Sequence, residues 1–197
     1  MTLRRRQVLA LLPAPFLANC AQARTLAADL KDGGYVIYLR HAESEGKPEP
    51  TLGDIKDCLW QANLTAAGKA QAVRVGQVLR ELGVRYGQIA SSPFCRCRDT
   101  AQLVTNRPPT VMPELLYHPG QTPNAQAATV ERLRILVSNR DPGGRCTLLV
   151  GHGEPFSAMT GIELGAAQGA IIRPELTKDF EIVGFVDPTG VRNRAGN

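Results

Sequence analysis

The chain has 197 residues, of which 43% are hydrophobic and 21% are charged. This length and composition exclude a disordered or fibrous protein and predict one globular domain with a sizeable core. The formal net charge is +5, but residues 1–23 hold three arginines and no acids, so the charge without them is +2. Most of the positive net charge therefore comes from residues 1–23, and it does not indicate a nucleic-acid partner.

Residues 1–23 have the pattern of a secretory signal peptide. Three consecutive arginines at residues 4–6 precede an apolar run over residues 8–17, and the sequence Ala-Gln-Ala follows at residues 21–23. A basic start, a short apolar stretch and an A-x-A cleavage site are the three parts of such a signal. The apolar run is too short to cross a bilayer, so no membrane span is expected.

Two further features of this segment bear on localisation. The sequence Arg-Arg-Gln-Val-Leu at residues 5–9 resembles a twin-arginine export signal, which carries folded proteins out of the cytoplasm. Cys20 is a less favoured candidate for a lipid anchor, because Asn19 stands where a lipoprotein signal has a small residue. The expectation is an exported, periplasmic protein.

Apolar runs and amphipathic stretches alternate along residues 24–190, which are expected to form a single domain. The predicted strands are 34–40, 88–91, 110–112, 145–152, 170–173 and 180–187, and the predicted helices are 65–82, 92–107, 124–137 and 155–159. This alternation predicts an α/β fold, a three-layer α/β/α sandwich with a mostly parallel central sheet. Residues 44–63 read as a long loop, and the chain after Asp187 reads as a frayed polar end, with residues 191–197 as a tail.

Two histidines stand at the ends of predicted strands. Arg40 and His41 close the first strand, and His152 closes the strand that begins at residue 145. Ligands of open α/β sheets bind outside the carboxyl ends of the strands, where parallel strands share one edge. We therefore expect His41 and His152 to share one site, with His41 as the nucleophile.

A third cationic group is Arg96, in the first turns of the predicted helix that opens at Ser92 and Pro93. The N-terminus of a helix attracts anions through its free N–H groups and its dipole. An arginine at that position adds bidentate recognition of phosphate-like oxygens. Arg96 is therefore a predicted phosphate-binding cation.

Four motifs follow one another in order across about residues 34–174. They are Arg40-His41-Ala42-Glu43, Leu64-Thr65-x-x-Gly68-x-x-Gln71-Ala72, Ser92-x-x-x-Arg96-x-x-x-Thr100-Ala101 and Val150-Gly151-His152. In this order they resemble the histidine phosphatase superfamily, which includes phosphoglycerate mutases and many phosphatases. The first motif has Ala42 where the family pattern has glycine.

The resemblance implies a phosphoglycerate mutase-like fold and phosphoryl transfer through a covalent phosphohistidine on His41. Arg40, Arg96 and His152 would surround the phosphoryl oxygens, where positioning and electrostatics supply most of the catalysis. It implies no metal ion and no cofactor, because these cations take the role that magnesium has in other phosphoryl-transfer sites. The expected substrate is a small phosphomonoester or a phosphoprotein; the substrate itself and the oligomeric state stay open.

The group that protonates the leaving oxygen is left open among three glutamates. Glu154 follows His152 by two residues and so lies near the same end of the strand. Glu114 resembles the acid position of the mutase branch. Glu43 is a third candidate, although a structural role in holding Arg40 is equally reasonable. His118 is expected to be an ordinary loop residue.

Three other functions remain as alternatives. The same fold could hold a non-catalytic phosphate-ligand binding protein or a mutase-type phosphoryl transferase. A zinc hydrolase using His41, His118 and His152 is disfavoured, because their spacing matches no zinc motif and Arg40 would repel the cation.

Four cysteines follow residue 23, and an exported protein permits disulfides among them. Cys58 could pair with Cys95 or with Cys97, and the sequence does not decide between the two. Buried free thiols at Cys97 and Cys146 are an equally reasonable interpretation.

Overall fold

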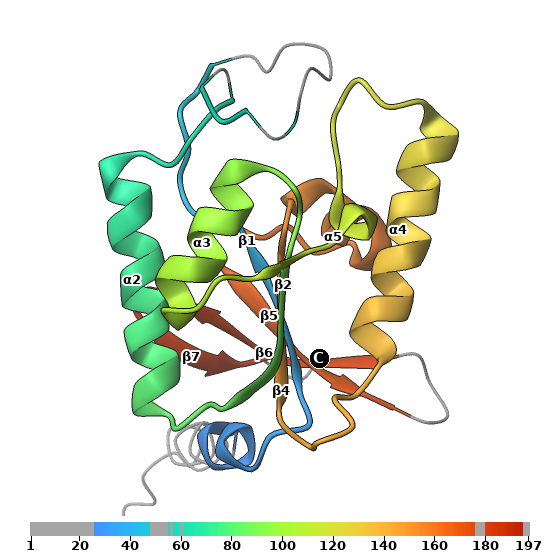
Figure 1. Cartoon of the computed structure of the whole chain (residues 1–197). Helices are drawn as coiled ribbons and strands as arrows, with labels where there is room; N and C mark the ends of the chain where they lie inside the picture. The colour runs from blue at the N-terminus through green and yellow to red at the C-terminus, as the bar shows by residue number, and fades with distance from the viewer. Residues whose placement is uncertain (1–25, 48–54, 56, 60, 176–179, 195–197) are drawn as a thin grey trace, which may run out of the picture.

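A mixed β-sheet forms the middle layer of the protein (Figure 1). The computed structural model describes residues 26–47, 55, 57–59, 61–175 and 180–194. Within that part of the chain, seven strands follow the order β3-β2-β4-β1-β5-β6-β7. They are β1 Val36–Arg40, β2 Tyr86–Ser91, β3 Thr110–Val111, β4 Cys146–Gly151, β5 Gly169–Pro174, β6 Phe180–Asp187 and β7 Gly190–Asn193.

The sheet has a parallel half and an antiparallel half. β3, β2, β4 and β1 are paired in parallel, whereas β5, β6 and β7 are antiparallel to their neighbours. The prediction of a mostly parallel sheet therefore holds for the half that contains β1 and β4. The site-bearing ends of these two strands lie next to each other, with Arg40 opposite Gly151 in the register.

The last strand corrects the expectation of a frayed end after Asp187. The Asp187 carboxylate accepts hydrogen bonds from the backbone N–H (2.8 Å) and hydroxyl (2.5 Å) of Thr189, which folds the chain into a tight turn. A connection this short joins antiparallel strands, so residues 190–193 return along β6 as β7. The predicted tail is thus wrong for residues 191–193, and residues 195–197 lie outside the described part of the chain.

Helices cover both faces of the sheet, which confirms the three-layer α/β/α fold class (Figure 1). Side chains of α2, α3 and the helical stretch 26–32 pack on one face, and those of α4 and α5 pack on the other. Among the described helices, none has the length and hydropathy that a membrane crossing needs. The bounds are α2 Ala66–Glu81, α3 Cys95–Thr105, the 3-10 helix η1 Pro113–Leu115, α4 Pro123–Ser138 and α5 Gly153–Thr160.

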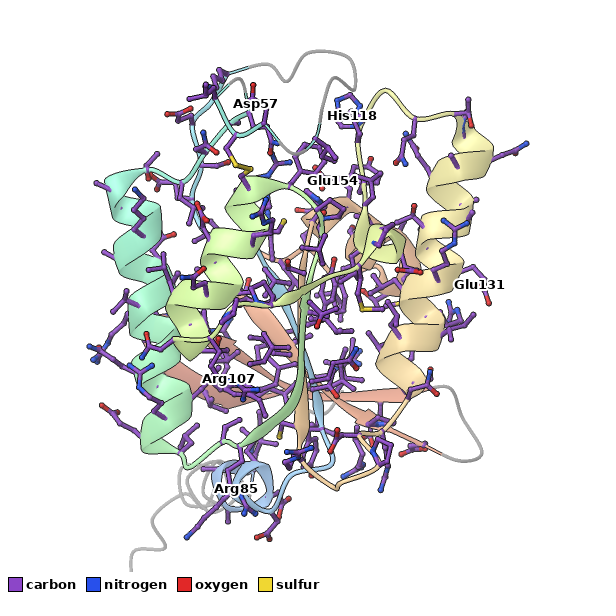
Figure 2. The ribbon with its side chains drawn as sticks, viewed as in Figure 1. Asp57, Arg85, Arg107, His118, Glu131 and Glu154 are labelled. Carbon is purple, nitrogen blue, oxygen red and sulfur yellow. A yellow bond between two sulfur atoms is a disulfide. The ribbon has the colours of Figure 1, made fainter. Side chains whose placement is uncertain are left out.

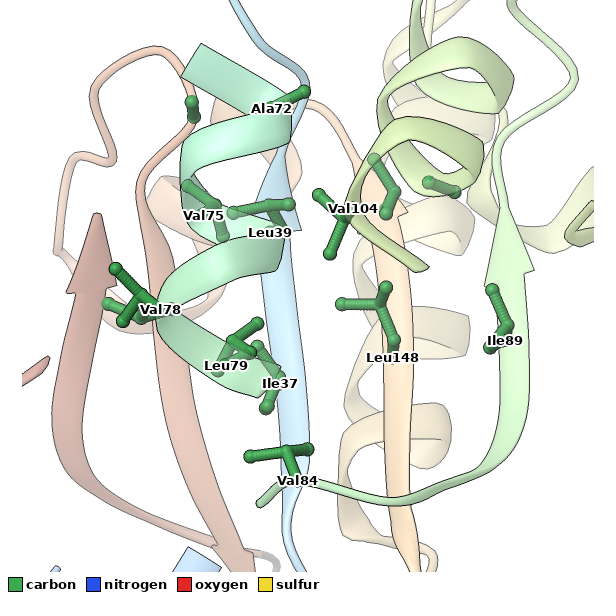
Figure 3. Close-up of a cluster of buried hydrophobic side chains, with 14 of the residues drawn as sticks. Ile37, Leu39, Ala72, Val75, Val78, Leu79, Val84, Ile89, Val104 and Leu148 are labelled. Atoms are coloured by element: carbon green, nitrogen blue, oxygen red, sulfur yellow. The ribbon is translucent and has the colours of Figure 1, made fainter. Parts of the chain in front are cut away.

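The alternation of side chains along β1 builds two separate apolar cores. Ile37 and Leu39 point towards α2, whose Val75 and Leu79 pack against them in the core drawn in Figure 3. Tyr38 points to the other face and stacks on Phe156 of α5, with ring centroids 5.1 Å apart. Because both faces of β1 are covered, its end is held rigidly where Arg40 and His41 leave the sheet.

The helix that carries Arg96 begins later than predicted. Ser92 still donates its N–H to Val150 of β4 (2.9 Å), so the chain keeps its strand pairing through Ser92. Pro93 and Phe94 then make the turn, and α3 starts at Cys95 with Phe94 as its N-cap. The prediction that Pro93 lies in the first helical turn is therefore wrong, and Arg96 lies closer to the helix start than expected.

Candidate active site

His41 lies just beyond the end of β1, with its imidazole held in one tautomer. Its backbone N–H donates to the carbonyl of Gly151 on β4 (2.9 Å), and ring atom Nδ1 lies 2.9 Å from the carbonyl oxygen of Ala42. A carbonyl can only accept a hydrogen bond, so Nδ1 carries the proton. Nε2 of the neutral ring therefore holds a lone pair, as a nucleophile requires.

The surroundings of His41 keep its ring uncharged. Burial lowers the pKa of His41 to about 4, and the positive charges of Arg96 and Arg40 act in the same direction. The hydrogen bond to Ala42 opposes this shift but does not outweigh it. The His41 ring is thus neutral near pH 7.

His152 directly follows the neighbouring strand β4 and serves as the N-cap of α5. Its side chain is 2% exposed, and its ring meets that of His41 edge to face at 5.5 Å between centroids. Arg96 Nη2 donates to Nδ1 (3.3 Å), which leaves the proton of the neutral ring on Nε2 for donation to Ser92 Oγ (3.1 Å). Burial, and next the charge of Arg96, hold the pKa of His152 well below its usual range.

Arg96 lies in the first turn of α3, and, together with burial, its positive charge lowers the pKa of both His41 and His152. Its side chain is 7% exposed, and its guanidinium carbon lies 4.3 Å from the centroid of the Phe94 ring. Thr100 connects this turn to the segment that follows β1, because its hydroxyl donates to the Arg96 carbonyl (2.7 Å) and accepts from the Ala42 N–H (3.1 Å). The structure therefore brings His41, His152 and Arg96 together.

Arg40 borders the site from the side of α5. Its Nη1 donates to the carbonyl of Leu164 (2.7 Å), and its side chain passes over Gly153 at the start of α5. A Cβ at Gly153 would lie only 3.2 to 3.3 Å from Arg40 Cδ and Nε. The missing side chain at Gly153 thus leaves the room that the guanidinium needs.

The motif of the first helix fastens α2 to the segment that follows His41. Thr65, the predicted N-cap, accepts from the Gly68 N–H (2.9 Å) and donates to the Glu43 carboxylate (2.8 Å), while Gln71 accepts from the Glu43 N–H (3.1 Å). A Cβ at Gly68 would fall 1.9 Å from the Glu43 carbonyl oxygen, so only glycine allows this approach. The carboxylate of Glu43 is bonded to Thr65 and not to Arg40, which corrects the structural role predicted for it.

Two adjoining pockets open over these groups. One, of about 490 Å³, is lined by His41, Arg96, His152 and Glu154 among others. The second, of about 770 Å³, is lined by Arg40 and shares Glu154 with the first. Of the two leading acid candidates, Glu154 in the first turn of α5 therefore faces both pockets, whereas Glu114 in η1 is exposed and lines neither.

Three groups of the site come from loops. No role was predicted for Tyr117 or Phe94, and the expectation that His118 is an ordinary loop residue is wrong, because it lines the pocket. His118 and Tyr117, between η1 and α4, line the pocket that contains His41, and Phe94 packs edge to face on His152 at 5.2 Å. Burial, and next the charge of Glu154, raise the pKa of Tyr117. Figure 2 shows His118 and Glu154 at the same end of the molecule. These loop residues belong to no periodic pattern, so only His118, as a histidine, carried any signal.

A disulfide joins Cys58 to Cys95, with the two Cα atoms 5.8 Å apart (Figure 2). This decides between the two predicted partners of Cys58, and Cys97 and Cys146 are buried free thiols. The bond attaches the loop of residues 44–63 to the first residue of α3, beside Arg96. Gln61 strengthens the attachment, since its side chain is fully buried and accepts from the Cys95 N–H (3.0 Å). Residues 48–54, 56 and 60 of the loop lie outside the described part of the chain.

Comparisons with known proteins agree with this architecture. Residues 36–116 match the family profile of the histidine phosphatase superfamily, branch 1. The structure of the protein histidine phosphatase SixA complexed with tungstate superposes with a TM-score of 0.59 at 17% identity, over 79% of this chain and 97% of that chain. The chain has the histidine phosphatase fold.

Two curated relatives match over shorter stretches. The mitochondrial serine/threonine-protein phosphatase Pgam5 of Drosophila virilis is 32% identical over 77 residues, which is 39% of this chain and 24% of that protein. A broad-specificity phosphatase of Saccharomyces cerevisiae is 30% identical over 69 residues, or 35% of this chain and 28% of that protein. The matches thus span about a quarter of each relative. The family match ends before His152, whose place in the site rests on the geometry.

Proposed function

We propose that this protein is a metal-independent phosphatase that hydrolyses phosphomonoesters through a covalent phosphohistidine on His41. The observation that carries the proposal is the state of the His41 ring. Its Nδ1–H is bound to Ala42, its Nε2 has a free lone pair, and its pKa is lowered to about 4 in a pocket lined by Arg96 and His152. A neutral imidazole beside a guanidinium is the arrangement that attack on a phosphate needs.

In the first step His41 Nε2 forms a bond to phosphorus while the bond from phosphorus to the leaving oxygen breaks. The negative charge on the phosphoryl oxygens is stabilised by Arg96 and Arg40, which the protein holds in place before substrate arrives. A water molecule then attacks the phosphohistidine, breaks the N–P bond and releases inorganic phosphate.

Glu154 is the proposed proton donor to the leaving oxygen. It is the leading candidate whose side chain lines the pocket with His41, and it also lines the adjoining pocket that the alcohol part of a substrate can enter. In the second step the same carboxylate can take a proton from the attacking water.

The substrate class follows from the open pockets and from what the relatives are. Pgam5 is a serine/threonine-protein phosphatase, the yeast relative has broad specificity, and SixA is a protein histidine phosphatase. All three are phosphatases, which favours hydrolysis over the mutase reaction. Small phosphomonoesters and phosphorylated protein side chains are therefore the substrates to test, rather than one metabolite.

Export to the periplasm is part of the proposal. It is supported by the signal pattern of residues 1–23 and by the disulfide between Cys58 and Cys95, since disulfides persist in oxidising compartments. Cell fractionation of the full chain tests it. Replacing both Arg5 and Arg6 by lysine should keep the protein in the cytoplasm, and unchanged export of that variant would refute the twin-arginine assignment.

Phosphate release by residues 24–197 tests the enzymatic function. The panel should hold 4-nitrophenyl phosphate, phosphoserine, sugar phosphates and a phosphohistidine peptide, each with and without a chelator. We expect release that a chelator does not affect and that His41→Ala abolishes. Binding of phosphate compounds without release would show a binding protein, and loss of activity with chelator would show a metal hydrolase.

A further inference from the structure

His118 is a buried histidine that the proposed mechanism does not use. It lies on the loop between η1 and α4, its side chain is 6% exposed, and it lines the pocket that contains His41 and His152 (Figure 2). The Gly120 N–H donates to its Nδ1 (2.9 Å), so in the neutral ring Nδ1 is the acceptor and Nε2 carries the proton. No acceptor for that proton is found among the described residues.

The loop holds this ring in place from several sides. The backbone N–H of His118 donates to the Gln121 side chain (3.0 Å), and the Gln121 N–H donates back to the His118 carbonyl (3.0 Å). The tight approach of Gly120 also limits movement, because a Cβ there would lie 3.0 Å from Nδ1. A donor whose orientation is fixed in advance loses little entropy when it binds a ligand.

Phe94 connects His118 to the phosphate-binding groups. The Phe94 and His118 rings are nearly parallel, at 7° and 6.4 Å between centroids, and the same phenyl ring contacts the Arg96 guanidinium and the edge of His152. One aromatic side chain thus positions three groups around one pocket. Two of them, Arg96 and His152, are the groups expected to surround a phosphoryl group.

We infer that His118 is a further phosphate-binding residue, which donates a hydrogen bond from Nε2–H to an oxygen of the substrate's phosphoryl group. The inference takes from the proposed function only that the ligand is a phosphoryl group. It concerns the binding of that group and not its hydrolysis. Phosphoryl oxygens are strong acceptors, and a hydrogen bond to a charged acceptor is about twice as strong as one between neutral groups. Two nearby pocket residues offer less: Lys47 is engaged in an ion pair with Glu45 (2.9 Å), and Glu154 carries no donor when ionised.

Calorimetric titration of the full chain with inorganic phosphate tests the inference without any need for turnover. His118→Ala removes the donor and should weaken phosphate affinity about 10- to 100-fold, as expected for one hydrogen bond to a charged group. His118→Gln is the matched control, because its amide nitrogen can occupy nearly the position of Nε2. It should retain most of the affinity.

Unchanged phosphate affinity in His118→Ala, or no phosphate binding by the parent chain, would overturn the inference. So would a leaving-group effect, in which both variants bind phosphate normally but hydrolyse alkyl phosphates much more slowly than 4-nitrophenyl phosphate. That result would make His118 a proton donor instead. The proposed function fails separately, when phosphate binds in a His118-dependent way but no ester is hydrolysed.

Discussion

At the scale of single residues, the neutral state of the His41 ring is linked to stability, because the burial that keeps the ring neutral also makes its protonation costly. Its pKa is about 4 in the folded protein and about 6.5 in the unfolded chain. Between these values the unfolded chain binds more protons, so the free energy of unfolding must fall as the pH falls. This is the reverse of the behaviour of a histidine that gains an acidic partner on folding.

Urea unfolding at pH 7 and pH 5 measures this effect. We expect acidification to lower the free energy of unfolding by about 2 kcal/mol more in the parent chain than in His41→Asn, which has no proton to bind. The pKa of His152 is lowered chiefly by burial and by the charge of Arg96, which both proteins keep, so most of its contribution cancels. Equal losses in the two proteins would show that His41 titrates normally.

Single substitutions also test whether Glu154 or Glu114 is the proton donor. Glu154→Gln should lower kcat about 100-fold for an alkyl phosphate and much less for 4-nitrophenyl phosphate, whose leaving group needs no proton. Glu114→Gln is the matched control and should keep nearly full activity, because Glu114 is exposed outside both pockets. Steady-state kinetics on the two substrates separates the two residues, and the opposite ranking of the variants would reassign the acid.

At the scale of elements, the disulfide is the strongest connection between the loop of residues 44–63 and α3. It closes 37 residues, for which the loss of chain entropy in the unfolded state predicts about 3–4 kcal/mol of stabilisation. The variant with alanine at both Cys58 and Cys95 should have a free energy of unfolding that is lower by that amount, as measured by urea unfolding. It should also show a raised KM, because Cys95 adjoins Arg96.

The buried Cys97 and Cys146 provide the control for this prediction, because they remain in the variant. A reductant should destabilise the parent chain to the level of the variant and have no further effect on the variant itself. If the reduced parent chain kept its stability, the disulfide would be dispensable for holding the loop.

The elements with a strong hydrophobic period were predictable from the sequence. The strand that ends at Arg40 and the helix capped by Thr65 lie where they were expected, because burial on fixed faces imposes their pattern. β7 was missed because residues 190–193 are short and polar, and an edge strand buries little. The late start of α3 was missed because strand pairing through Ser92 is a tertiary contact, which the local preference of Pro93 does not reveal.

At the scale of the whole molecule, the site is assembled where β1 and β4 end side by side and α3 and α5 begin. This explains why His41, His152 and Arg96 were found from the sequence, since strand ends and helix starts are visible in its pattern. The walls of the site were not predictable in the same way. His118, Tyr117 and Phe94 stand in turns, and only the folded chain shows that they face the two histidines.

The central claim is that His41 becomes covalently phosphorylated, and rapid-quench trapping tests it most directly. Residues 24–197 should be mixed with a ³²P-labelled phosphomonoester, quenched in alkaline denaturant within milliseconds and digested for mass spectrometry. We predict a label that is stable in base, labile in acid and located on the peptide that contains His41, and its absence from His41→Asn. Turnover without label on the protein, or a label on another residue, would contradict this account.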